Sequence, residues 1–215
     1  MRLLRTPKYT RLLSQTGVKN MPPLKVPGLR GHFPSLVFVI VAAMLASFVF
    51  GLFVYAGIYN IAADAPHAPP TLWILGRLRQ RSITVHARSI SVPANLTDPA
   101  NISVGAGLYA GMCTGCHLAP GMAKTEMSQG LYPPAPELSH GVSLTPAEEF
   151  WVIKHGVKLS AMPAWGQTHS DTLIWDMVAF LRVLPSLSPA QYQAQVKAAP
   201  ADHDEMMQGM AGAGG

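Results

Sequence analysis

The sequence predicts a mainly α-helical protein in which a single N-terminal transmembrane helix precedes a small helical domain. An uncharged apolar run of 25 residues near the N-terminus predicts the transmembrane helix. Three helix-start signals predict the domain, because a capping side chain followed by proline or an acid is typical of a helix N-terminus. These signals are Asp98-Pro99, Thr145-Pro146 and Ser170-Asp171, and the only two cysteines of the chain lie between the first and the second.

The apolar run extends from Ser35 to Tyr59 and contains no acid, lysine, arginine or histidine. As an α-helix it would be about 37 Å long, enough to cross a hydrocarbon core of about 30 Å. A cleaved signal peptide is the alternative, because Ala63-Asp64-Ala65 resembles a cleavage site. A signal core usually has only about 7 to 15 apolar residues, however, so we expect a retained anchor.

Basic charge is concentrated before this run. Residues 1–34 hold seven of the 16 lysines and arginines and no acid, whereas the rest of the chain holds nine cations and all 11 acids. The net charge of +5 therefore reflects the leader and does not indicate a nucleic-acid partner. Because cationic segments beside a span are retained in the cytoplasm, we expect a bacterial inner-membrane protein with a cytoplasmic N-terminus and a periplasmic domain.

We expect five segments along the chain. They are a basic leader (1–34), the anchor (35–59), a proline-rich connector with an amphipathic or extended arm (60–97), the folded domain (98–188) and a flexible C-terminal tail (189–215). Within the arm, leucines interleaved with arginines over 72–81 predict a short amphipathic helix. The β-branched residues over 82–97 predict an extended arm or an edge strand.

Three helices are predicted in the domain. They run from Asp98 to Cys113, from Thr145 to about Gly156, and from Ser170 or Asp171 to Pro185. The second begins with the pattern Thr-Pro-Ala-Glu, which satisfies a capping box. In the tail, the histidine and methionines of segment 202–210 could bind copper weakly, but a disordered terminus is the stronger expectation.

The two cysteines belong to the sequence Cys113-Thr114-Gly115-Cys116-His117. Two thiols at this spacing, followed directly by a histidine, are typical of covalent haem attachment, in which each thiol binds one vinyl group and the histidine reaches the iron. A zinc site would need two further ligands, and a thioredoxin-type redox pair would need a βαβ context. A short disulfide is the remaining alternative. We expect one covalently attached haem c.

With this motif, residues 98–188 resemble a class I c-type cytochrome. The resemblance rests on Gly105 and Tyr109 before the motif, on the motif itself, and on Gly130–Leu138, Met162–Gly166, Trp175 and Phe180 after it. It implies a cytochrome c fold of three to four helices around one haem. It also implies thioether bonds from Cys113 and Cys116, with His117 as the proximal iron ligand and Met162 as the distal one.

The position of Met162 in the sequence independently favours it as the distal ligand. It follows His117 by 45 residues, enough chain to reach the opposite face of the ring, and Pro163 restricts the backbone beside it. Met122 follows His117 by only five residues. His155 is the main rival, although Met/His ligation raises the reduction potential and so keeps the iron more easily reduced.

The resemblance also implies residues around the ligands. In this family a proline carbonyl after the motif accepts a hydrogen bond from the proximal histidine, which points to Pro136, with Pro133 and Pro134 as alternatives. Trp165 and Tyr132 are candidates for contacts to the haem edge or propionates. Aromatic residues in a small core are more often part of its packing.

The expected function is single-electron transfer by a membrane-tethered mono-haem c-type cytochrome in a respiratory chain. The expected partners are a quinol-side or dehydrogenase donor and a terminal oxidase or similar acceptor. Because protein ligands would fill both axial positions, we expect no catalytic residue and no enzyme activity of the domain alone. One alternative is a fixed cytochrome c subunit of a larger membrane oxidoreductase or oxidase complex. Another is a gas sensor or peroxidase in which Met162 dissociates.

Overall fold

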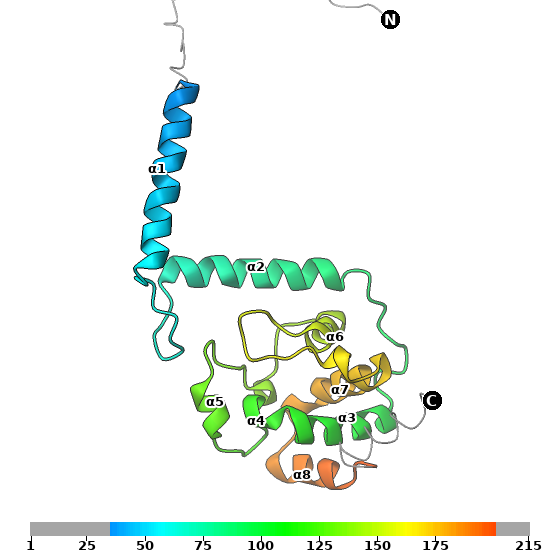
Figure 1. The fold of residues 1–215 in the computed structure, drawn as a ribbon. Helices are drawn as coiled ribbons and strands as arrows, with labels where there is room; N and C mark the ends of the chain where they lie inside the picture. The colour runs from blue at the N-terminus through cyan, green and yellow to red at the C-terminus, as the bar shows by residue number, and fades with distance from the viewer. Residues whose placement is uncertain (1–34, 201–215) are drawn as a thin grey trace, which may run out of the picture. The chain divides into compact units, whose positions relative to one another are not determined.

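The computed structural model describes residues 35–200 (Figure 1). The predicted basic leader (1–34) and the candidate copper segment (202–210) lie outside the described residues. The chain divides into two compact units, Met1–Tyr59 and Asn60–Gly215. Over the described part of the chain, the regular elements are α-helices and short 3-10 helices, without any β-strand. The predicted mainly helical class is therefore confirmed.

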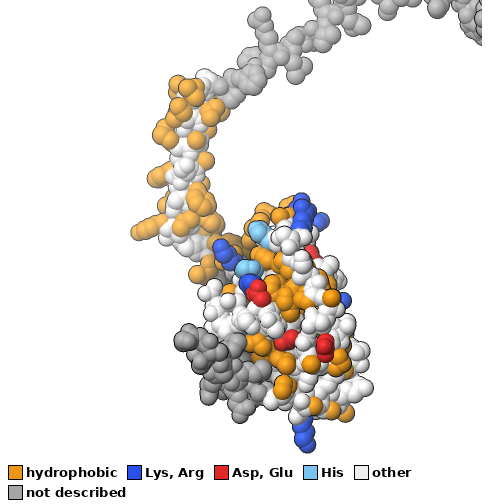
Figure 2. Space-filling model, turned by 90° about the vertical axis from the view of Figure 1, so that its right-hand side faces the viewer, with side chains coloured by type: hydrophobic (Ala, Val, Ile, Leu, Met, Phe, Trp, Pro, Cys, Tyr) orange, Lys and Arg blue, Asp and Glu red, His pale blue; other side chains and the backbone are white. Residues whose placement is uncertain are grey.

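The first unit contributes one described helix, α1 (Leu36–Tyr55). Ser35 caps it, because its hydroxyl accepts a hydrogen bond from the Phe38 N–H at 3.2 Å. Apolar side chains cover its surface (Figure 2), and its mean hydropathy is 2.8. A helix that is apolar on every face fits an apolar environment. By length and composition α1 can cross a membrane, although a signal sequence would meet the same test.

The second unit holds the remaining helices. They are α2 (Pro69–Ala87), α3 (Pro99–Met112), α4 (Thr114–His117), α5 (Glu126–Gly130), α6 (Pro146–His155), α7 (Asp171–Val183) and α8 (Pro189–Lys197). The three helices predicted for the domain correspond to α3, α6 and α7. Each begins at the predicted cap, where Asp98, Thr145 and Ser170 accept hydrogen bonds from backbone N–H groups of the first turn.

The core of this unit is built where α3 crosses α7 (Figure 1). The two backbones approach so closely that a Cβ on Gly105 would lie 2.0 Å from the Asp176 carbonyl oxygen. Buried aromatic rings fill the space on one side of this crossing, with the Tyr109 and Phe180 ring centroids 5.4 Å apart. On the other side Phe150 of α6 stacks on Trp175 at 4.3 Å. The crossing holds in place the end of α3, from which the cysteine motif continues.

The structure corrects the prediction of an extended arm or edge strand over 82–97. Helix α2 continues to Ala87, and α2 packs against α6 (Figure 1). Ile83 and Ala87, four residues apart on one helical face, are both buried. The Thr84 hydroxyl also donates a hydrogen bond of 2.8 Å to the Glu148 carboxylate on α6. This tertiary contact outweighs the β-propensity of the branched residues.

The flexible tail predicted from residue 189 is also wrong over Pro189–Lys197. These residues form α8, which begins with a reciprocal capping box between Ser188 and Gln191. Tyr192 of α8 is 4% exposed and packs edge-on against Tyr109. The buried ring explains why the helix stays on the domain.

Candidate cofactor site

The cysteine motif folds as a helical turn at the end of α3. The Cys113 N–H donates to the Tyr109 carbonyl at 2.9 Å, and the His117 N–H donates to the Cys113 carbonyl at 2.8 Å. The chain leaves this turn at Leu118, whose φ is +59°. The buried Tyr109 hydroxyl donates a hydrogen bond of 2.6 Å to the Leu118 carbonyl, so α3 fixes both ends of the motif.

A mainly apolar cavity of about 500 Å³ opens beside this turn. This volume lies within the range of about 300–1,000 Å³ that is usual for cofactor sites. Its walls come from the motif, the loop before α6, helix α6, the loop that follows α6, and α2. All six residues predicted to bind the cofactor line the cavity: Cys113, Cys116, His117, Pro136, Met162 and Trp165.

His117 is oriented by the loop that carries Pro136. Its Nδ1 lies 2.8 Å from the Pro136 carbonyl oxygen. A carbonyl can only accept, so Nδ1 carries the hydrogen and Nε2 keeps a lone pair that can bind a metal. Burial lowers the pKa of His117, partly opposed by this hydrogen bond, and so favours the neutral ring. Pro133 and Pro134 also line the cavity, but the hydrogen bond is made to Pro136.

The two thiols face the same cavity and are not bonded to each other. Burial raises the pKa of Cys113 to about 12, and the neighbouring Cys116 contributes to the shift. Thiol–disulfide exchange requires a thiolate, and redox-active cysteines usually have a lowered pKa. The environment of Cys113 therefore disfavours the thioredoxin-type alternative.

Met162 reaches the cavity through a tight loop after α6. Gly156 ends α6 with a φ of +66°, and a Cβ there would lie 2.7 Å from the Met162 carbonyl oxygen. The Val157 N–H donates to that same carbonyl at 3.2 Å and closes the loop. His155, the rival ligand, is not among the residues that line the cavity, and its ring packs 5.1 Å from that of Trp151.

The two aromatic candidates are placed differently. Trp165 lines the cavity next to the Met162 loop. Tyr132 does not line it, and its hydroxyl oxygen instead accepts a hydrogen bond of 2.8 Å from the His67 N–H. Tyr132 thus attaches the connector to the domain, and only Trp165 is positioned to contact a molecule in the cavity.

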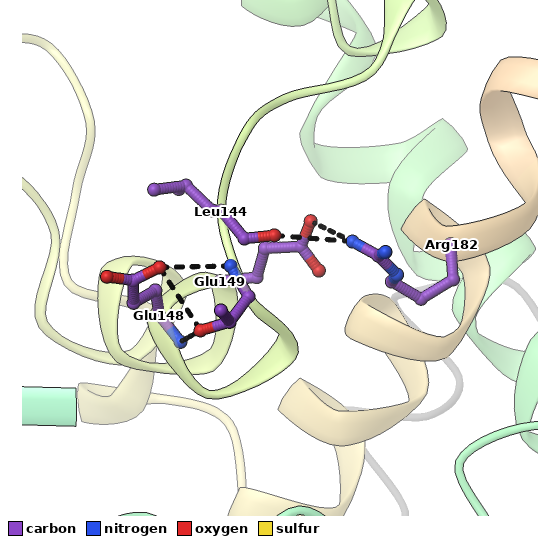
Figure 3. A network of polar contacts seen from close by, with 5 residues as sticks. Leu144, Glu148, Glu149 and Arg182 are labelled. Carbon is purple, nitrogen blue, oxygen red and sulfur yellow. Dashed lines mark hydrogen bonds and ion pairs between the residues drawn. The ribbon is translucent and has the colours of Figure 1, made fainter. Parts of the chain in front are cut away.

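Polar residues that the sequence analysis missed also line the cavity, among them Ser160 of the loop after α6. Arg79 and Gln80 come from α2, and Glu149 comes from α6. Glu149 is 3% exposed, and one carboxylate oxygen pairs with Arg182 of α7 at 3.0 Å (Figure 3). Burial raises the pKa of Glu149 to about 7, although Arg182 opposes the shift. Glu149 precedes Ile153 by four residues, so the two share one face of α6, and Ile153 also lines the cavity. This spacing was the sequence signal that could have identified Glu149 as a lining residue.

The lining residues fit a haem c. Apolar walls suit the macrocycle, two thiols at the attachment spacing suit its vinyl groups, and the neutral His117 supplies a nitrogen ligand. This histidine donates its other ring nitrogen to a carbonyl, as metal-ligating histidines usually do. Met162 and Trp165, on the loop that follows α6, complete the wall with a thioether and an aromatic ring.

This fold and cavity define a c-type cytochrome domain that binds haem c covalently, preceded by a candidate membrane anchor. Residues 100–181 match the family model described as cytochrome c oxidase, cbb3-type, subunit III. The match includes the attachment motif, α6, the Met162 loop and most of α7. Comparisons with curated proteins and with solved structures found no match. Residues 100–181 therefore form a c-type cytochrome domain, and the apolar helix α1 before it is consistent with a membrane anchor.

Proposed function

We propose that this protein transfers single electrons on the periplasmic side of a bacterial inner membrane, as part of a respiratory chain. One haem c would supply the reversible Fe(III)/Fe(II) couple. The observation that carries the proposal is that His117 and Met162, from separate segments, line a single cavity. If both residues hold the iron, it would have no open position for a substrate, and electron transfer is then the chemistry that the domain would support.

Each residue has a defined part in this proposal. Cys113 and Cys116 hold the haem covalently, and the Pro136 carbonyl fixes the ring orientation of His117. Met162 would be the second protein ligand of the iron, and its thioether would raise the potential relative to a second histidine. Trp165 and the apolar walls exclude water from the macrocycle. The anchor confines the domain to the membrane, which increases its effective concentration near membrane-bound partners.

Carbon monoxide binding tests whether both axial positions are filled by protein. The reduced wild-type protein is expected not to bind carbon monoxide rapidly, whereas Met162→Ala opens the sixth position and binds it. Met122→Ala serves as the matched control, because Met122 is 43% exposed and does not line the cavity. A lower reduction potential is also expected for Met162→Ala and not for the control. Rapid binding by the wild type would instead favour a gas sensor or peroxidase.

A fixed subunit of a larger membrane oxidoreductase is the second candidate function. The description of the matched family model as an oxidase subunit favours it. Extraction in mild detergent followed by size analysis separates the two candidates. A lone chain supports the mobile carrier, whereas co-purification with other haem or flavin subunits supports the fixed subunit.

The proposed topology has its own test. A reporter enzyme that works only in the periplasm, fused to the C-terminus, is expected to be active. The same reporter fused at the N-terminus is expected to be inactive, because the basic leader should remain in the cytoplasm. The reverse pattern would overturn the orientation and leave the haem assignment unaffected.

A further inference from the structure

Two adjacent glutamates on α6 have opposite environments (Figure 3). Glu148 caps the helix, accepting hydrogen bonds from the Thr145 N–H at 3.0 Å and from the Thr84 hydroxyl at 2.8 Å. These contacts lower its pKa. Glu149 points to the other side, where it is 3% exposed and lines the cofactor cavity. Burying a charged carboxylate is costly unless other groups compensate its charge. The groups around Glu149 therefore decide whether its side chain is charged or neutral.

Only half of the Glu149 carboxylate is compensated. The Arg182 Nη1 group donates to Oε1 at 3.0 Å and also donates to the Leu144 carbonyl at 3.4 Å (Figure 3). The other oxygen, Oε2, is buried and has no hydrogen-bond partner. Binding a proton at this oxygen would remove the buried negative charge, whose desolvation is costly. Since the Arg182 side chain is 44% exposed, the pair also extends to solvent, from which a proton can come.

We propose that Glu149 is a proton-binding site coupled to the haem electron, so that its carboxylate takes up one proton when the iron is reduced and releases it when the iron is oxidised. One electron passes from the redox partner to the iron, and one proton passes from water to Oε2. This inference rests on the haem c and the electron transfer proposed above. It adds that the domain carries a proton with the electron.

The coupling follows from the charge inside the cavity. Oxidation would add one positive charge to the haem, and this charge would favour the ionised form of the Glu149 carboxylate. Reduction would remove the charge and so favour the protonated form. Two unit charges about 10 Å apart, at an effective dielectric constant of about 20, change a proton affinity by roughly tenfold. The pKa of Glu149, raised to about 7 by burial, lies in the range where this change matters.

The other charged groups around the cavity have fixed or different roles. Arg182 from α7 and Arg79 from α2 remain cationic, and His117 from α4 is held neutral as the proposed ligand. Among the residues that line the cavity, the only other ionisable side chains are those of the two cysteines, Cys113 and Cys116. On α6 itself, Glu148 lies outside the cavity lining. The haem propionic acids and Asp176 of α7, whose pKa burial raises to about 6, are competing sources of protons, so the experiment must separate them from Glu149.

The test is a redox titration of the full-length, haem-loaded protein between pH 5 and 9 for the wild type, Glu149→Gln and Glu148→Gln. Protonation favours the reduced state, so the wild-type potential is expected to fall as the pH rises through about 7. A tenfold coupling corresponds to a total fall of about 59 mV. Glu149→Gln should be flat across this window, whereas Glu148→Gln, which retains a capping side chain, should follow the wild type.

The Arg182→Gln variant and infrared difference spectra provide two further tests of the role of Glu149. Arg182→Gln removes a charge that favours the carboxylate, so the fall in potential should move to higher pH. Infrared difference spectra should show a protonated-carboxyl band on reduction that is absent from Glu149→Gln. A flat wild-type profile, or a Glu149→Gln profile that still falls, would overturn the proposal, the latter in favour of the propionates or of Asp176. Absence of covalent haem or of a reversible one-electron couple would instead refute the proposed function.

Discussion

Replacing Gly105 by alanine should separate the two helices that form the core. A Cβ at this position would lie 2.0 Å from the carbonyl oxygen of Asp176 and 2.8 Å from the Cβ of Phe180, where an ordinary contact begins at 3.4 Å. The obstructing oxygen belongs to the α7 backbone, so it cannot move without moving the helix. Overpacking usually costs about 1–3 kcal/mol, and we expect the upper end of this range here.

The higher helix propensity of alanine offsets about 1 kcal/mol of this cost. The net loss in the free energy of unfolding is therefore about 2 kcal/mol, which lowers the midpoint of a domain of this size by about 8 °C. Circular dichroism of the haem-loaded, full-length protein in detergent measures the midpoint. The ratio of haem to protein absorbance should be checked first, so that a loss of cofactor is not mistaken for a loss of packing.

Gly76→Ala is the matched control for this experiment. Gly76 lies in α2, and a Cβ built there has no atom within 4 Å, so the same substitution meets no obstacle. Its stability should be unchanged or raised by up to about 1 kcal/mol. The packing explanation fails if Gly105→Ala loses less than about 1 kcal/mol, or if both variants lose the same amount.

Two further predictions concern groups buried near the same crossing. Tyr109→Phe leaves the Leu118 carbonyl without its 2.6 Å donor and should cost about 1–3 kcal/mol in denaturant unfolding; an unchanged free energy of unfolding would show that water replaces the hydroxyl. Burial raises the pKa of Asp176 from 3.8 to about 6, so folding favours its protonated form and stability should fall as the pH rises between these values. Asp176→Asn should remove this part of the fall, by at most about 3 kcal/mol, in thermal midpoints measured from pH 4 to 8; an equal fall in the variant would contradict the assignment.

Local chemistry explains which parts of the structure could be predicted from the sequence. The cysteine motif is predictable because its spacing is set by the haem that it attaches. The start of α6 is predictable because Thr145 and Glu148 satisfy each other's backbone partners within one turn. The start of α3 follows in the same way from Asp98 and the proline after it. In each case the determining contacts lie within a few residues of one another.

The parts that could not be predicted depend on contacts between distant segments. The helical state of residues 82–87 depends on burial of Ile83 and on the bond from Thr84 to Glu148, 64 residues away. The position of α8 depends on Tyr192 packing beside Tyr109. Glu149 looks like an ordinary surface acid in the sequence, because only the folded structure brings Arg182 to one of its oxygens and leaves the other unpaired.

The same distinction applies to the proposed function. The cysteine motif is local and can attach a haem in a carrier, a sensor or a peroxidase. What would separate these classes is whether a second protein ligand holds the iron, and under the proposed function Met162 and its loop would supply that ligand. That loop is held by the left-handed Gly156 and by Ser160, whose hydroxyl donates to the Val157 carbonyl at 2.7 Å and accepts from the Met162 N–H at 3.2 Å. In the proposed function, the stability of this loop, more than the attachment motif, would therefore determine whether the iron is closed to small molecules and restricted to electron transfer.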